Sequence, residues 1–148
     1  PVVRRQMGEA YRQFLQTKVT DLALTGHVTF VDKFLSDREL IETLLATDVY
    51  LAPQRDPYQA TSGTLAYALG MGTAVIATPT AYAQEVLADG RGILVPFANA
   101  PRFGQSLLTL AHSPTVLEHL QKQSYAYGRR MIWSNVGREY RLLFQEFV

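Results

Sequence analysis

Residues 48–78, DVYLAPQRDPYQATSGTLAYALGMGTAVIAT, hold two short apolar segments that are separated by a loop and a helix-forming stretch. DVYLAP predicts a strand that ends at Pro53, because proline cannot donate a hydrogen bond to a strand ladder. The β-branched run TAVIAT predicts a second strand, which stops before Pro79. A helix is expected between them, from about Gly63 to Met71. This order of strand, helix and strand predicts a right-handed βαβ unit with two parallel strands.

The segments on either side continue the alternation. HVTFV, near residue 28, and ILVPF, near residue 93, predict two more strands. The four strand starts lie about 20 to 25 residues apart, as in successive βαβ units. We therefore expect an α/β fold, in which helices cover both faces of a doubly wound, Rossmann-like parallel sheet.

Helical periodicity and capping residues predict the remaining helices. An opening helix is expected from Arg4 to about Leu24, ended by Gly26 in a left-handed conformation. Since such a helix ordinarily follows a strand, we expect the first strand of the sheet to lie upstream of this chain. Ser36 and Glu39 form a capping box at the start of the next helix. Later helices are expected from about Tyr82 to Ala88 and from starts at Asn99, at Ser113 followed by Pro114, and at Ser134.

Length and composition narrow the class of protein. The chain of 148 residues fits one domain. Its net charge of +1 is too small to attract nucleic acid or acidic membranes electrostatically. The absence of cysteine excludes a disulfide framework, a thiolate nucleophile and a cysteine-based zinc site. No apolar run approaches the roughly 20 residues that span a bilayer, and PVVRRQMGEA lacks the pattern of a signal peptide. We expect a cytoplasmic domain with no metal, no cofactor and no nucleic-acid partner.

Ligands of such a fold bind beyond the carboxyl ends of the strands. The longest loop there leads into QATSGTLAY, residues 59–67, where a helix starts. The N–H groups and partial positive charge of a helix N-terminus suit a phosphate, and Gly63 lets a ligand approach the main chain. The alternative is that Thr61 or Ser62 is only the N-cap of this helix. The polar side chains expected to assist a phosphate are Thr61, Ser62, Thr64, Arg55 and Lys33.

A family resemblance is carried by residues 48–97, in particular by TSGTLAY, ALGMGTAVIAT and EVLADGRGILV. This run resembles the donor-nucleotide half of retaining family-four (group 1) glycosyltransferases, which have the two-domain GT-B architecture. The likeness extends from about Val28 to the C-terminal WSNVGREYRLLF. It implies that residues 1–148 form a nucleotide-sugar (donor) binding domain, the C-terminal half of a GT-B enzyme whose acceptor domain lies upstream.

The resemblance also implies which residues hold the donor. The family binds the diphosphate through main-chain N–H groups that match Ser62, Gly63 and Thr64. Two family glutamates, one near the sugar and one on the ribose, match Gln59 and Tyr67, and neither of these is a carboxylate. An amide and a phenol can still form hydrogen bonds with hydroxyl groups, but both lack the charge.

Two further positions are assigned by the resemblance. Glu85 matches a family glutamate near the donor sugar, and an acidic residue favoured by the dipole in the first turn of a helix is an equal alternative. The base is expected against residues 33–35. The residues expected to contact the base or to add charge are Lys33, Phe34 and Arg55.

The function implied is that of a retaining, metal-independent glycosyltransferase, which moves a sugar from a nucleoside diphosphate to an acceptor. Its partners would be the nucleoside-diphosphate sugar and the N-terminal acceptor domain, with peripheral membrane association through that domain. The catalytic residues are unknown, because the usual catalytic histidine belongs to the acceptor domain, so we expect binding without turnover by the isolated chain. The alternative is a non-catalytic nucleotide- or partner-binding module, since Gln59 and Tyr67 replace carboxylates. A sugar-nucleotide epimerase is weaker, because its acid/base carboxylates and histidines are not visible in the sequence.

The C-terminal segment carries an apolar stripe at helical spacing. Its default interpretation is a stripe that packs onto the rest of the domain. The resemblance adds the option that the last helix crosses to the acceptor domain. The residues of this stripe are Val136, Tyr140, Leu143, Phe144 and Phe147.

Overall fold

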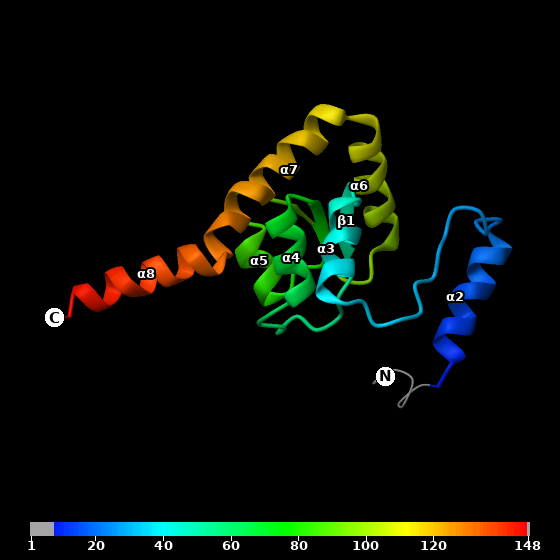
Figure 1. Ribbon diagram of the computed structural model, residues 1–148. Helices are drawn as coiled ribbons and strands as arrows, with labels where there is room; N and C mark the ends of the chain where they lie inside the picture. Colours follow the sequence, from blue (N-terminus) through cyan, green and yellow to red (C-terminus); the bar gives the residue numbers. More distant parts are fainter. Residues whose placement is uncertain (1–7, 148) are drawn as a thin grey trace. The chain divides into compact units, whose positions relative to one another are not determined.

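The chain divides into two units, Pro1–Phe34 and Leu35–Val148, in a computed structural model that describes residues 8–147. The first unit contains the helix α2 (Ala10–Asp21), followed by turns and an extended segment. The second unit contains the sheet and the remaining elements, several of which are labelled in Figure 1. In chain order these are α3 (Asp37–Leu45), β1 (Val49–Ala52), α4 (Gly63–Met71), β2 (Ala74–Ala77), α5 (Ala81–Val86), β3 (Ile93–Leu94), α6 (Ala100–His112), α7 (Pro114–Gly128), the 3-10 helix η1 (Arg129–Met131) and α8 (Trp133–Gln145).

The sheet of the second unit has three parallel strands in the order β1-β2-β3. Val49 of β1 pairs with Ala74 of β2, and Ile76 of β2 pairs with Ile93 of β3. β2 is therefore the central strand, and each of its residues is buried. Its continuous apolar sequence, AVIA, is typical of a parallel strand that has helices on both faces.

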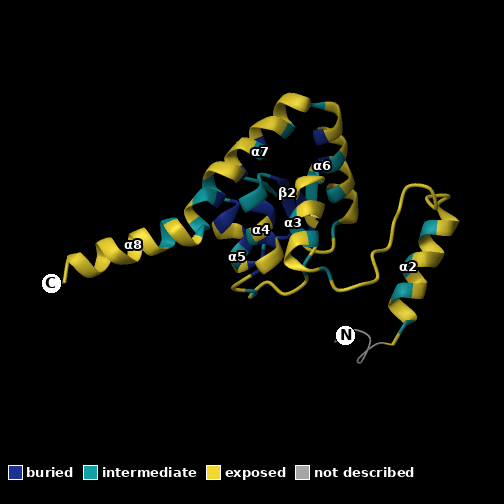
Figure 2. Ribbon diagram, viewed as in Figure 1, coloured by how far each residue is buried: buried dark blue, intermediate teal, exposed yellow. Residues whose placement is uncertain are grey.

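Helices cover both faces of this sheet. Because successive strand side chains point to opposite faces, Val75 and Ala77 enter one core cluster, and Ala74 and Ile76 enter another. The first cluster is completed by α3, α4 and α5, and the second by α6 and α7. Figure 2 shows the buried residues gathered on the sheet and on the helix faces that cover it. The predicted α/β fold with a parallel sheet is confirmed.

The central βαβ unit has the predicted boundaries. β1 stops before Pro53, and α4 runs from Gly63 to Met71. Gly72 ends α4 with a φ of 76°, a left-handed conformation that favours glycine. The capping box of Ser36 and Glu39 is present at the start of α3.

The strand predicted over HVTFV, residues 27–31, is not formed. The backbone N–H of Val28 instead donates to the Leu24 carbonyl in a turn, at 3.1 Å. Among the described residues, none of 27–31 joins the sheet. A strand outside a sheet leaves its backbone groups unpaired and is unstable. The sheet therefore contains three of the four predicted strands.

The end of α2 also differs from the prediction. The expected start at Arg4 lies outside the described residues, within which the helix begins at Ala10. The helix ends at Asp21, and it is Ala23, with a φ of 54°, and not Gly26 that takes the left-handed conformation. The Leu24 N–H closes this end by donating to the Val19 carbonyl, at 2.8 Å. The chain therefore leaves the helix before the glycine is reached.

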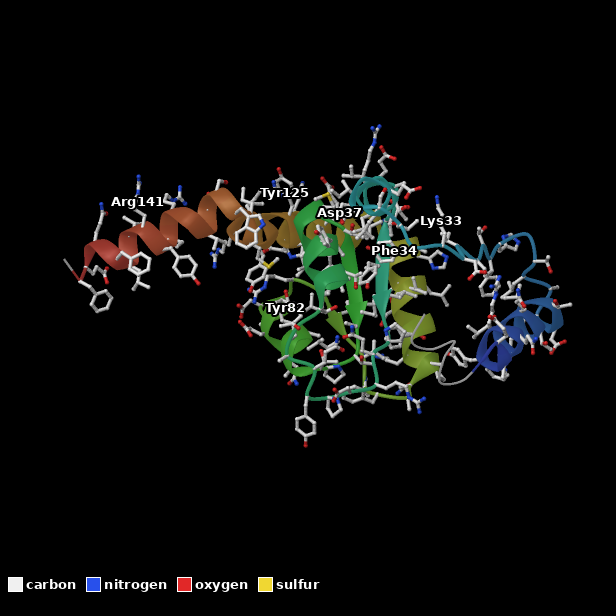
Figure 3. All side chains as sticks on the ribbon, turned by 60° about the horizontal axis from the view of Figure 1, so that its bottom comes forward. Lys33, Phe34, Asp37, Tyr82, Tyr125 and Arg141 are labelled. Atoms are coloured by element: carbon white, nitrogen blue, oxygen red, sulfur yellow. The ribbon has the colours of Figure 1, made fainter. Side chains whose placement is uncertain are left out.

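The C-terminal helix α8 begins one residue earlier than predicted and does not pack as expected. Its N-cap is Ile132, which has extended backbone, so the helix starts at Trp133 and not at Ser134. No described residue of α8 is buried, and Phe144 is 64% exposed. In Figure 3, Arg141 projects from one side of α8 and aromatic rings project from the other. The default prediction of a packed aromatic stripe is therefore wrong. None of the helices in residues 8–147 is long and apolar enough to cross a membrane.

Candidate functional site

The loop after β1, residues 53–62, is fastened to the segment that follows β2. The hydroxyl of Thr78 donates to the Gln54 carbonyl at 2.6 Å. The backbone N–H of Ala81 donates to the Pro57 carbonyl at 2.8 Å, and that of Tyr82 donates to the Gln59 carbonyl at 3.0 Å. The start of α4 and the start of α5 are therefore held together at the carboxyl edge of the sheet, where α/β folds bind their ligands.

The N-terminus of α4 lacks a side-chain cap. Ser62 occupies the N-cap position and is only 8% exposed, but its side chain makes no capping hydrogen bond. Its hydroxyl oxygen instead accepts from the Gln54 amide, at 3.3 Å. The starts of α3, α5 and α6 are capped by Ser36, Thr80 and Asn99, whereas α2, α7 and α8 resemble α4 in having no side-chain cap. The alternative that a side chain of this loop merely caps α4 is therefore not realised.

Gly63 and Thr64 form the first two helical positions of α4. A Cβ added to Gly63 would meet no atom within 4 Å, so space is open beside the main chain. The hydroxyl of Tyr50, on β1, donates to the Thr64 hydroxyl oxygen at 2.8 Å. The Thr64 hydroxyl keeps its own proton for donation to another group. The first N–H groups of a helix have no partner within it.

Gln59 lies in the loop before α4, and Tyr67 lies in the second turn of that helix. The Gln59 side-chain amide donates to the Thr61 carbonyl at 3.0 Å, which holds the loop in shape. Tyr67, on α4, is 41% exposed. Asp56, the carboxylate of this loop, accepts from the Tyr58 N–H at 3.0 Å in a turn. The loop therefore presents amide, hydroxyl and main-chain groups near the helix start.

The other predicted site residues fall into two groups. Glu85 is exposed in the second turn of α5, because that helix starts at Ala81, so the alternative of a first-turn acidic residue is wrong. Arg55 is exposed in the loop after β1. Lys33 and Phe34 belong to the first unit, and Phe34 is 94% exposed. Their contact with a base stays a prediction.

Several residues that shape the edge were not singled out from the sequence. Gln54 and Tyr50 hold the two hydroxyls of the α4 start, and Thr78 ties the loop to the end of β2. Alternation along β1 was a signal for Tyr50, since it shares its face with the buried Ala52. Thr80 was readable as an N-cap from its place just before AYAQEV. The Gln54 contact joins residues from a loop and had no local signal.

Tyr82, on α5, contacts the 3-10 helix η1. Its hydroxyl contacts the sulfur of Met131 at 4.0 Å. Burial raises the pKa of Tyr82, and the nearby Tyr127 and Glu85 add to this rise. A phenol is already neutral around neutral pH, and the raised pKa keeps Tyr82 neutral further into the alkaline range, so it acts as a packing and hydrogen-bonding group.

Comparison with known proteins identifies the family to which this chain belongs. Residues 5–113 match the family described as "Glycosyl transferases group 1". The chain belongs to the group 1 glycosyltransferases. No curated protein matches it.

Solved structures of group 1 glycosyltransferases and related enzymes share the fold. The C-terminal domain of a glycosyl transferase group 1 family protein (LpcC) from Francisella tularensis matches with a TM-score of 0.72 and 18% identity, over 80% of this chain and 60% of that one. Sucrose-phosphate synthase from Thermosynechococcus elongatus matches with a TM-score of 0.72 and 24% identity, over 93% of this chain and 35% of that one. The chain thus spans less than two thirds of either structure, and identities this low establish the fold alone.

Proposed function

We propose that this group 1 glycosyltransferase chain binds the nucleoside-diphosphate sugar of a retaining, metal-independent transfer reaction. The observation that carries the proposal is the start of α4, where Ser62 makes no cap and space is open beside Gly63. A diphosphate placed there accepts from main-chain N–H groups and meets the positive end of the helix dipole. Membership of a glycosyltransferase family makes a nucleotide sugar the natural source of that diphosphate.

The side chains around this start supply the remaining contacts of the proposal. The Thr64 hydroxyl, which accepts from Tyr50, donates its proton to a phosphate oxygen. Tyr67 reaches the ribose, and Glu85 on α5 reaches the sugar. Arg55, in the loop after β1, supplies the diphosphate with the full positive charge that the hydroxyl groups lack. The acceptor and the catalytic histidine belong to a separate acceptor domain.

Calorimetric titration of the chain with UDP, GDP and ADP tests the nucleotide site. We expect one of the three to bind with a 1:1 stoichiometry and the others to bind more weakly, because the base contacts differ. Binding is also expected to weaken in high salt, since a charged diphosphate is neutralised at the site. The absence of binding by all three nucleotides at millimolar concentration contradicts the proposal.

A non-catalytic binding module is the second candidate function. It is favoured by Gln59 and Tyr67, which stand where the resemblance places carboxylates. The two functions separate in an assay of sugar transfer and nucleotide-sugar hydrolysis by the protein together with its acceptor domain. Turnover removes the second candidate, and nucleotide binding without any turnover favours it.

Replacement of Tyr67 tests the proposed ribose contact. Tyr67→Phe removes only the hydroxyl of a side chain that is 41% exposed. We expect nucleotide affinity to fall about fivefold, the equivalent of about 1 kcal/mol for one lost hydrogen bond. The melting temperature should not change, because the rest of the ring is retained. An unchanged dissociation constant means that the hydroxyl does not meet the ribose.

The exposed face of α8 supports the proposal of an acceptor domain as partner. Phe144→Glu places a charge on a residue that is 64% exposed and belongs to no core cluster. We expect the free energy of unfolding of the isolated chain to change by no more than about 0.5 kcal/mol, as for other surface substitutions. Association with the acceptor domain should be lost, as measured by co-purification or by calorimetry. Gln145→Glu, a charge change on the neighbouring position, is the control.

A further inference from the structure

We propose that Arg91 is a positioning residue, which fixes α5 so that Glu85 is presented to the donor sugar. This inference rests on the proposed function, because it assumes that a nucleotide sugar occupies the edge of the sheet. It assigns to Arg91 an effect on recognition of the sugar and no effect on recognition of the diphosphate.

The guanidinium group of Arg91 binds carbonyl groups at the C-terminal end of α5. Its Nε donates to the Val86 carbonyl at 2.8 Å, and one terminal nitrogen donates to the Glu85 carbonyl at 2.9 Å. The last carbonyls of a helix have no partner within it, and a cation there also interacts favourably with the helix dipole. α5 runs only from Ala81 to Val86, so it is too short to be stable without such support.

The same side chain ties α5 to α7. The guanidinium lies over the ring of Tyr127, at 4.4 Å from its centroid, and the side chain is only 16% exposed. The buried hydroxyl of Ser124, also on α7, donates to the Arg91 carbonyl at 3.2 Å. A cation over an aromatic face in a partly desolvated place resists displacement more than an exposed ion pair does. Arg91 is therefore held from two directions.

The charge of Arg91 is matched by Asp89 and not by Glu85. A terminal nitrogen of Arg91 donates to the Asp89 carboxylate at 2.9 Å. Among the described residues, no ion pair joins Arg91 to the carboxylate of Glu85, whose backbone carbonyl is the group that Arg91 binds. Glu85 is thus fixed through its main chain, and its carboxylate is left for a ligand.

The two ends of α5 are held by different parts of the unit. At its start, Thr80 caps the helix and the Tyr82 N–H donates to the Gln59 carbonyl of the loop before α4. At its end, Arg91 connects it to α7. Loss of Arg91 therefore frees the Glu85 end and leaves the loop and the α4 start in place, which separates the sugar contact from the diphosphate contact.

The test compares nucleotide sugars with bare nucleotides in calorimetry. The protein is titrated with UDP-glucose, GDP-mannose and ADP-glucose, and separately with UDP, GDP and ADP. For each pair, the ratio is the dissociation constant of the bare nucleotide divided by that of the nucleotide sugar, and it measures how much the sugar adds to the affinity. For Arg91→Met we expect this ratio to fall about tenfold, as for one lost hydrogen bond to a charged group, with the affinity for the bare nucleotide unchanged. Glu85→Gln should lower the ratio similarly, and Arg91→Met should lower it no further in the Glu85→Gln background.

Two further measurements distinguish a general loss of stability from the loss of Glu85 positioning. Asp89→Asn keeps an acceptor for Arg91 and suits the left-handed φ of 55° at this position, so the ratio should not change. Hydrogen exchange of Arg91→Met should be faster, about tenfold, at the amides of residues 83–87 and unchanged in α4. This readout needs no ligand.

The outcomes are distinct. An equal fall in affinity for nucleotides and nucleotide sugars, an unchanged ratio, or unchanged exchange in α5 each overturns the inference. The same holds if Arg91→Met lowers the ratio as much in the Glu85→Gln background as in the wild type. If the wild type binds no nucleotide, the proposed function fails, and faster exchange in α5 still identifies Arg91 as the anchor of that helix.

Discussion

Gly63→Val is expected to abolish nucleotide binding while the protein stays folded. The branched side chain fills the space beside the first turn of α4, where a Cβ meets no protein atom within 4 Å. A phosphate then cannot approach the main chain, and the loss of two hydrogen bonds to a charged group corresponds to about 100-fold or more in affinity. Calorimetry with the nucleotide that the wild type prefers measures the effect, and thermal melting checks the fold.

Gly104→Val is the matched control for this prediction. Gly104 lies in α6, and a Cβ there also meets no atom within 4 Å. Both variants place a β-branched residue in an exposed position of a helix, so they should change the free energy of unfolding by similar amounts of about 1 kcal/mol or less. Only Gly63→Val should lose the nucleotide. If Gly63→Val binds as well as Gly104→Val does, the diphosphate does not sit at the start of α4.

Gly128→Ala is expected to be the most damaging small substitution in the second unit. Gly128 lies at the end of α7, where a Cβ would stand 2.5 Å from the Leu69 carbonyl oxygen and 2.7 Å from the Gly70 Cα. Both neighbours are backbone atoms of α4, so neither can turn away as a side chain does. The helices must separate, and we expect the free energy of unfolding to fall by about 3 kcal/mol, as for overpacked cores.

Gly70→Ala provides the comparison from the facing helix. A Cβ on Gly70 meets no atom within 4 Å, although this residue lies at the same crossing of α4 and α7. The alanine should leave stability unchanged or raise it by up to about 1 kcal/mol, because alanine favours a helix over glycine. Chemical denaturation of both variants measures the difference. Equal stabilities contradict the close approach of the two helices at Gly128.

The sequence predicted the centre of the fold well because its signals are local. Pro53, the helical stretch from Gly63 to Met71 and Gly72 each act on their own backbone, and α4 has the predicted bounds. The alternation of short apolar strands with helices was enough for a parallel sheet, since a helical crossover returns the chain to the same end of the sheet before the next strand begins. Capping by Ser36 was equally local, because Glu39 lies three residues away.

The prediction of a strand at residues 27–31 was wrong because a strand depends on a partner. HVTFV has the composition of a strand, but none of the described residues pairs with it. The packed stripe of α8 was wrong for a related reason. Helical spacing shows that Tyr140 and Phe144 share a face, and it does not show what covers that face.

The residues of the candidate site show where sequence and tertiary structure each decide. By itself the sequence determined that a small, hydroxyl-rich segment with Gly63 starts a helix directly after a strand, because the succession of elements along the chain and the start of a helix depend on local residues. Only the tertiary structure decided that the Ser62 hydroxyl accepts from Gln54 and leaves α4 without a cap, and that Arg91 anchors α5 on Tyr127. A hydrogen-bonding side chain has several possible partners, and which one it takes depends on groups that folding brings near it from elsewhere in the chain.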